Sequence, residues 1–235
     1  MKGLFSLVAA GLLVAVARAE TGSGSFCYGD VNMKCSSSAD EGVAIPNCNA
    51  AYGGAASAME QLSNYVNTHI TRSFQYLLMS THFGSYEANR PGFEKLYRIL
   101  SDQSWEASLD LIKHMTKRGG KMNFNYREAD NLANEPAKKE VYELHELGSL
   151  ARALDIQKSL AEEAFHIHHT CAAKDPKHHD AELTHYLEEN FIEKHADTIR
   201  NLAGHTSDLK NLLKTSDASL SVFLFDEYLF NKLSG

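Results

Sequence analysis

Apolar residues recur at intervals of three and four along four long stretches of the chain, through residues 59–77, 93–112, 144–164 and 183–202. This spacing places the apolar side chains of each stretch on one face of a helix. Each stretch therefore predicts an amphipathic helix of roughly 25–30 residues. A shorter apolar run, SLSVFLFDEYLFNKL at 219–233, suits either a helix or a strand. Because it follows four helices, we expect a fifth helix there.

Prolines and glycines mark the expected helix boundaries. Pro91, Pro136 and Pro176 each stand directly before a long stretch without proline. Proline is favoured in the first turn of a helix, so each of the three is a predicted helix start. Gly119 and Gly120 follow the second stretch and predict its end.

The lengths of the connections predict the topology. The first two helices are joined by about seven residues and the last two by fewer, which makes each pair antiparallel neighbours. Residues 119–135 can extend over roughly 55 Å, whereas a helix of this length spans about 40 Å. The sequence thus predicts an all-α four-helix bundle in which two hairpins are joined by one long crossover, with a short fifth helix at the C-terminus.

The first nineteen residues have the pattern of a secretory signal peptide. A positive charge at Lys2 precedes an apolar run, and Ala17-Arg18-Ala19 has the form of a cleavage site. The run is shorter than the roughly 18–20 apolar residues of a membrane anchor. We expect a secreted chain with a signal peptide at 1–19, an N-terminal extension at 20–54 and a bundle domain at 55–235.

The net charge of −7 argues against nucleic acid or an anionic membrane surface as a partner. Four cysteines are present: Cys27, Cys35 and Cys48 in the extension, and Cys171 in the bundle domain. In an oxidising compartment such residues usually form disulfides, and the spacings of a zinc finger are absent. Three cysteines in one extension cannot all pair with one another. At least one must reach Cys171 or another chain, or stay free, and we expect an intersubunit bridge through Cys27 or Cys35.

Four separated motifs carry a resemblance to a known family: YVNTHITRSFQYLLMSTHFG, RGG at 118–120, DPKHHDAELTHYLEE and LFDEYLF. In order and spacing they resemble ferritin subunits over residues 55–233. The signal peptide and the cysteine-containing extension make the chain most similar to the secreted ferritins of insects. The resemblance implies a ferritin-like bundle that handles iron in a 24-subunit shell, built from copies of this chain and heavy-type ferritin subunits.

The resemblance also assigns six positions to the di-iron ferroxidase centre of catalytic ferritin subunits: His69, Tyr76, Ser104, Ala107, Gln157 and Asn190. Tyr76 keeps the family's tyrosine and Asn190 replaces a glutamine, whereas the other four positions have lost a glutamate or a histidine. Two iron ions in a buried site need several carboxylates to offset their charge. We therefore expect a chain without ferroxidase activity, which makes it a light-type subunit rather than an enzyme.

Two rival interpretations remain open from the residues alone. E-x-x-H pairs at Glu163/His166 and Glu182/His185 have the spacing of di-iron bundles, although both lie near one turn at the end of the bundle. They leave room for an active ferroxidase. The second rival is a secreted histidine-rich metal carrier that forms no shell.

Asp102 and Glu106 occupy positions that the resemblance assigns to nucleation of the ferric mineral. They are four residues apart and hence on one helix face. The alternative is that they belong to the solvated face of an amphipathic helix, which is where most such residues lie.

The turn between the third and fourth helices carries six histidines: His166, His168, His169, His178, His179 and His185. The resemblance places this turn at the three-fold channels of the shell, with Asp180 as a channel carboxylate and His168 as a histidine beside the channel. Converging carboxylates attract cations, and neutral imidazole suits transition metals. The alternative is that these histidines decorate an exposed turn.

Overall fold

The computed structural model describes residues 27–35, 48–124, 144–173, 175, 178–214 and 217–234. The chain divides into two compact units, Met1–Asn49 and Ala50–Gly235. In the first unit, the described residues form one helix, α1 (Cys27–Cys35), and a disulfide joins Cys27 to Cys48. The predicted signal peptide lies outside the described residues.

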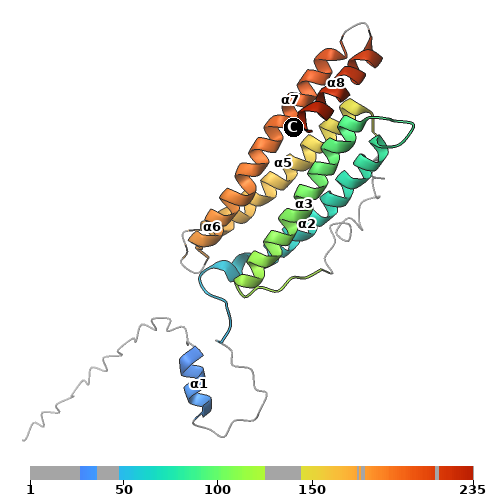
Figure 1. The fold of residues 1–235 in the computed structure, drawn as a ribbon. Coiled ribbons are helices and arrows are strands. Elements are labelled where there is room, and N and C mark those ends of the chain that lie inside the picture. The colour runs from blue at the N-terminus through green and yellow to red at the C-terminus, as the bar shows by residue number, and fades with distance from the viewer. Residues whose placement is uncertain are drawn as a thin grey trace, which may run out of the picture. The chain divides into compact units, whose positions relative to one another are not determined.

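The second unit is a helical bundle, and the described residues contain no strand. Its elements are a 3-10 turn η1 (Ala55–Ala58), α2 (Met59–Phe83), α3 (Pro91–Lys117), α5 (Glu146–Cys171), α6 (Ala181–Leu187), a π turn η2 (Glu188–Ile192), α7 (Glu193–Leu212) and α8 (Ala218–Lys232). In Figure 1, α2 lies beside α3, and α5 lies beside the continuous α6–η2–α7 segment. The short α8 packs against α3 and α7. The predicted all-α bundle with a fifth helix is confirmed.

The long crossover is confirmed by the two ends that it connects. At one end of the bundle, Asn67 near the start of α2 donates a hydrogen bond to the carbonyl of Asn123 at 2.9 Å. At the other end, Arg90, just before α3, forms an ion pair at 3.0 Å with Glu146, the first residue of α5. Residues 124 and 144 therefore lie at opposite ends of the bundle, as a long crossover between the two hairpins requires. Figure 1 shows the two helix pairs that it connects.

The predicted boundaries agree with the structure at the second helix only. α3 begins at Pro91 and ends just before Gly119, whose φ is +77°. Pro136 and Pro176 lie outside the described residues, and the helices that follow them begin later, at Glu146 and Ala181. The start of α6 is set by Asp180, whose side chain accepts a hydrogen bond from the N–H of Leu183. A capping carboxylate therefore starts this helix instead of the proline.

The apolar faces of the helices meet in one continuous core, with the side chains of Leu62, Val66, Leu100 and Leu160 almost fully buried. A polar layer that includes His69, Gln157 and His195 interrupts this core. None of the helices described by the structure is long and apolar enough to cross a bilayer.

Candidate functional site

Five of the six residues that the resemblance assigned to a di-iron centre line one cavity of about 510 Å³: His69, Ser104, Ala107, Gln157 and Asn190. The sixth, Tyr76, is fully buried beside Gln157, whose side-chain amide donates a hydrogen bond to the Tyr76 hydroxyl at 3.2 Å. These six positions, predicted from all four long helical stretches, thus lie together in the bundle.

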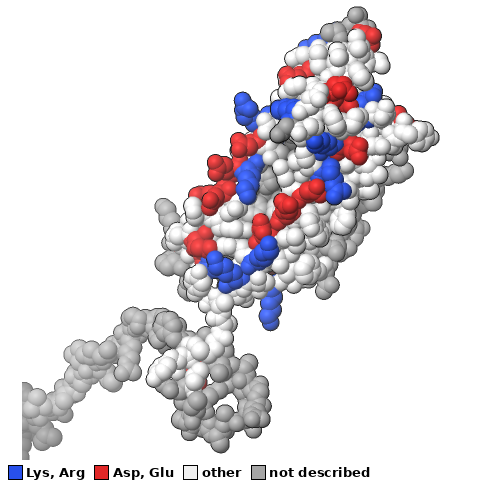
Figure 2. Space-filling model, in the orientation of Figure 1, with Lys and Arg blue, Asp and Glu red and all other residues white. Residues whose placement is uncertain are grey.

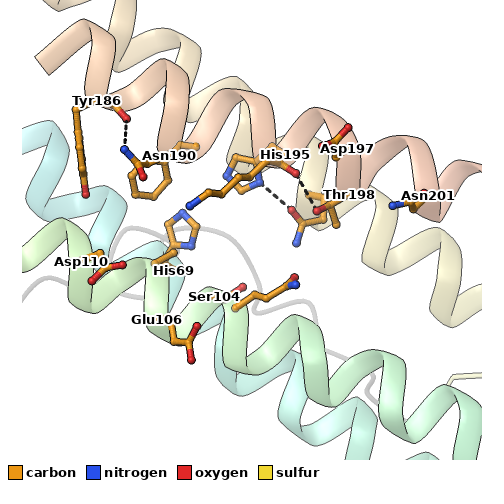
Figure 3. A pocket seen from close by; sticks show the side chains of 15 residues that line it. His69, Ser104, Glu106, Asp110, Tyr186, Asn190, His195, Asp197, Thr198 and Asn201 are labelled. Carbon is orange, nitrogen blue, oxygen red and sulfur yellow. Dashed lines mark hydrogen bonds between the residues drawn. The ribbon is translucent and has the colours of Figure 1, made fainter. Parts of the chain in front are cut away.

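Helical spacing aims these side chains at a common point. His69 and Tyr76 are seven residues apart on α2, and Ser104 and Ala107 are three apart on α3, so each pair shares a helix face. Gln157 faces them from α5. Figure 3 shows the His69 ring in the space between α3 and the η2–α7 segment. The cavity is therefore built where the four long helical segments meet.

A chain of hydrogen bonds crosses the bundle at this level. The hydroxyl of Tyr65 lies 2.9 Å from Nε2 of His195, and Nδ1 of His195 lies 2.9 Å from Oε1 of Gln157. Nε2 of Gln157 then donates to the Tyr76 hydroxyl, which donates to the carbonyl of Ala153 at 3.2 Å. His195 was not predicted from the sequence, although it lies four residues after the buried Phe191 and so shares the inward face of the fourth helix.

The hydrogen-bond partners of His195 determine which of its two ring nitrogens carries the hydrogen. Oε1 of Gln157 can only accept, so Nδ1 of His195 carries a hydrogen. Burial lowers the pKa of His195 to about 4, and the ring is neutral at pH 7. Nε2 is therefore an acceptor for the Tyr65 hydroxyl, whose single hydrogen is shared with the carbonyl of Leu160 at 3.1 Å. Every link between Tyr65 and Tyr76 joins neutral groups, and this arrangement needs no metal ion to balance a charge.

His69 lies beside this chain but outside it. Its ring is 5.7 Å from that of His195, centroid to centroid, and neither of its nitrogens has a hydrogen-bond partner among the described residues. Burial, and secondarily the neighbouring His195, lowers the pKa of His69 to about 3. The residue that replaces a glutamate is therefore a neutral imidazole at pH 7 and brings no negative charge to the cavity.

Carboxylates lie toward the outside of the cavity. Glu106 and Asp110 on α3 and Asp197 on α7 line it, together with Lys194. Figure 2 shows acidic side chains gathered over both of these helices. Asp102 does not line the cavity; its exposed carboxylate accepts from Arg98 at 3.1 Å.

Two of these carboxylates were not singled out from the sequence. Asp110 follows Glu106 by four residues, a spacing that the sequence displays. Asp197 is brought there by packing between distant helices. The π turn Glu188–Ile192, which carries Asn190, was also unexpected. A π turn adds one residue to the helix, and a single shift of one position is hard to tell from the ordinary mixture of three- and four-residue spacings.

A ferritin-like domain model matches residues 59–211 of the chain. The chain belongs to the ferritin family. It is 45% identical over 226 residues to a ferritin light chain of Trichoplusia ni, covering 93% of this chain and 96% of that one. It is 45% identical over 204 residues to a ferritin light chain of Drosophila melanogaster, covering 87% and 88%. The crystal structure of Trichoplusia ni secreted ferritin is similar, with a TM-score of 0.77 and 43% identity over 88% of this chain and 98% of that one.

The carboxylate expected at a ferritin channel is not free in this chain. Asp180 is 5% exposed, and its two oxygens accept from Arg118 at 3.2 and 2.6 Å. Burial alone would raise the pKa of Asp180, but the hydrogen bonds from Arg118 and the Leu183 N–H outweigh it and lower the pKa. A buried arginine thus pairs with this carboxylate within the subunit, and the channel role of Asp180 stays a prediction.

The histidine-rich turn forms separate pairs instead of a cluster. His168 lies 2.7 Å from a carboxylate oxygen of Glu188, and His178 lies 3.2 Å from one of Asp175. Among the described residues, no group of three or more histidines, cysteines or carboxylates is arranged to hold a metal ion. This holds also for the E-x-x-H pairs Glu163/His166 and Glu182/His185, neither of which belongs to such a group.

The described cysteines differ in their bonding state: two form a disulfide and one is a free thiol. Cys27 pairs with Cys48 inside the chain, so the intersubunit bridge expected through Cys27 is wrong. Cys171 is a buried free thiol, which corrects the disulfide expected there. Burial raises its pKa to about 11, so the reactive thiolate is scarce at pH 7. Cys35 ends α1, and its side chain lies outside the described residues.

Proposed function

We propose that this ferritin is the light-type, non-catalytic subunit of a secreted iron-storage shell. The observation that carries the proposal is the neutral hydrogen-bond chain at the level of the expected di-iron centre. His69, Ser104, Ala107 and Gln157 offer no carboxylate there, and Gln157 is already bonded at both ends of its amide. Two iron ions would lack the anionic ligands that offset their charge.

Iron is the substrate and cargo in this proposal, and it would contact the protein at the carboxylates on the outer side of the cavity. Glu106, Asp110 and Asp197 line the same cavity from two helices, and their negative charges raise the local concentration of cations there. With Asp102 one turn away on α3, they offer the oxygen ligands that ferric ions prefer. We assign mineral nucleation to this group, which we call the acidic rim.

A catalytic partner would supply the oxidation of Fe(II). This chain is 45% identical to the ferritin light chain of Trichoplusia ni but 30% identical, over 164 residues, to a ferritin heavy chain of Papilio xuthus. Trichoplusia ni has proteins described as a ferritin light chain and as a ferritin heavy chain. We propose a 24-subunit shell in which this chain and a heavy-type subunit assemble together.

Secretion of the chain is part of the proposal. The pattern of residues 1–19 and the Cys27–Cys48 disulfide both suit an oxidising secretory compartment. The similar crystal structure is described as a secreted ferritin.

Assembly and iron loading test this function together. The mature chain is purified alone and after coexpression with a heavy-type subunit, and the native mass and the iron content per particle are measured. We expect a shell-sized particle containing both chains that mineralises faster than the chain alone. A monomer or dimer that binds a few ions would support the metal carrier instead.

A further inference from the structure

The RGG motif at residues 118–120 has no part in the cavity or the acidic rim. Arg118 follows the last residue of α3, and its side chain is 1% exposed. A buried guanidinium requires compensating partners. The partners of Arg118 come from both sides of the sequence, from residues near 52 and residues near 180.

Arg118 binds the turn before α6 with its guanidinium. Nη1 and Nη2 donate to both oxygens of Asp180, and Nη1 also donates to Glu182. The side chain of Asp180 is 3% exposed. This bidentate ion pair fixes the orientation of the guanidinium plane.

The same guanidinium holds the segment that leads into the bundle. Nη2 donates to the carbonyl of Tyr52 at 3.1 Å, and the guanidinium lies 4.1 Å from the centre of the Tyr52 ring. On the other side, the carboxylate of Asp180 accepts a hydrogen bond from the backbone N–H of Ala55. Residues 52–55 are therefore attached to the Arg118–Asp180 pair at two backbone groups and one ring.

Glycines allow this segment to lie against its neighbours. Gly53 has a φ of +65°, and a Cβ there would lie 2.7 Å from a carboxylate oxygen of Asp180. Gly119 has a φ of +77°, and a Cβ there would lie 2.8 Å from the backbone nitrogen of Ala51. Both positions combine a backbone conformation that favours glycine with a contact that excludes a side chain.

We propose that Arg118 and Asp180 form a clamp that fixes residues 50–55 of this chain to the end of the bundle, at the start of α6. Arg118 and Asp180 are positioning residues, and the RGG motif supplies the arginine and the close passage at Gly119. Cys48 is four residues before Tyr52, so the chain between them spans at most about 14 Å. The clamp thereby fixes the point at which the disulfide-containing extension joins the bundle.

The clamp has a consequence for assembly, and this step rests on the proposed function. Fixing residues 50–55 shortens the free tether of the extension, which would otherwise begin at α2, and a shorter tether raises its effective concentration at a neighbouring site that it can reach. The clamp therefore promotes the covalent link between this chain and a partner subunit.

Hydrogen exchange measured by mass spectrometry tests the clamp itself in the purified native particle. In Gly53→Ala, which keeps both Arg118 and Asp180 but places a Cβ against the Asp180 carboxylate, amides of residues 50–57 should exchange at least about tenfold faster, while those of α2 stay protected. Gly204→Ala is the matched control, because a Cβ there meets no atom within 4 Å, and it should exchange like the parent. Asp180→Asn keeps an acceptor for the Leu183 N–H and should resemble Gly53→Ala. Unchanged protection of residues 50–57 in Gly53→Ala, or fast exchange in the parent, would overturn the clamp.

A non-reducing gel of shells assembled with a heavy-type subunit tests the consequence separately. Gly53→Ala should form less covalent dimer than Gly204→Ala at equal times of oxidation. Equal yields would overturn the role in assembly and leave the exchange result to decide the clamp. If the parent forms no covalent dimer, the proposed covalent assembly fails and the role in assembly fails with it.

Discussion

Gln157 determines what the centre of the bundle can hold. Its amide accepts from His195 and donates to Tyr76, whereas a glutamate in its place would only accept. The Tyr76 hydroxyl would then have to donate to the carboxylate, and the contact of Tyr76 with Ala153 would be lost. Glutamine is thus the side chain that completes a neutral chain of hydrogen bonds.

Acid should destabilise this subunit through its buried histidines. The folded-state pKa is about 3 for His69 and about 4 for His195, below the value near 6.5 of an unfolded chain. Between these values the unfolded state binds more protons, so stability falls as the pH falls below 6.5. At pH 5 each histidine should cost about 2 kcal/mol relative to pH 7.

Denaturant unfolding at pH 7 and pH 5 measures this loss. His69→Gln, which does not titrate, should lose about 2 kcal/mol less than the parent between the two pH values. His185→Gln is the control, because His185 is exposed, and it should behave like the parent. Equal pH dependence of the parent and His69→Gln would show that His69 is not buried in its neutral form.

Mineral formation should depend on the acidic rim. Asp102→Ala with Glu106→Ala removes two carboxylates from α3, and a barrier higher by about 1 kcal/mol would lengthen the lag before core growth about fivefold. The initial oxidation rate in shells with the heavy-type partner should not change. Asp155→Ala with Glu162→Ala removes two exposed carboxylates from α5 and should leave the lag unaltered. A lag equal to the parent's in the first double variant would assign Asp102 and Glu106 to the solvated helix face.

Single residues were predictable from sequence where helical spacing decides their direction. His69, Ser104 and Gln157 met at the predicted level because each lies on an inward helix face. The burial of Asp180 was not predictable, because it depends on Arg118, which lies 62 residues away in the chain. The spacing of residues near Asp180 contains no sign of that partner.

At the scale of elements, apolar periodicity located every long helix, but it could not locate all of their ends. Pro91 marks a start because it occupies the first turn of α3. The start of α6 depends on one hydrogen bond from the Leu183 N–H to Asp180. Phe191, inside the π turn Glu188–Ile192, contacts the rings of Tyr65 and His69 on α2, and such contacts between distant helices are not visible in local spacing.

The C-terminal helix should depend on Asp226 for its docking. The Asp226 carboxylate accepts from the backbone N–H of Phe93 at 3.0 Å, so α8 caps the first turn of α3. Asp226→Ala would leave that buried N–H without this partner and should lower the free energy of unfolding by about 1–3 kcal/mol. Glu227→Ala, at the exposed neighbouring position, should change it by less than about 0.5 kcal/mol. Chemical denaturation at pH 7 measures both variants, and equal stabilities would contradict the capping role.

At the scale of the whole molecule, Cys35 is the residue to test for a covalent link between subunits. Cys27 and Cys48 pair with each other and Cys171 is buried. On a non-reducing gel, denatured shells should contain a covalent dimer of this chain with its heavy-type partner, which reduction separates. Cys35→Ser should abolish the dimer and Cys171→Ser should retain it. A dimer that persists in Cys35→Ser would place the bridge elsewhere.

The central claim is that this ferritin chain does not oxidise iron by itself, and oxygen uptake after addition of Fe(II) tests it most directly. Particles made of this chain alone are compared with buffer, with heavy-type shells, and with a variant carrying His69→Glu, Ser104→Glu, Ala107→His and Gln157→Glu. We predict that the parent consumes oxygen no faster than buffer during the first seconds, while the variant gains measurable activity because carboxylates return to the cavity. Rapid oxygen uptake by the parent, accompanied by a transient blue species, would contradict the account.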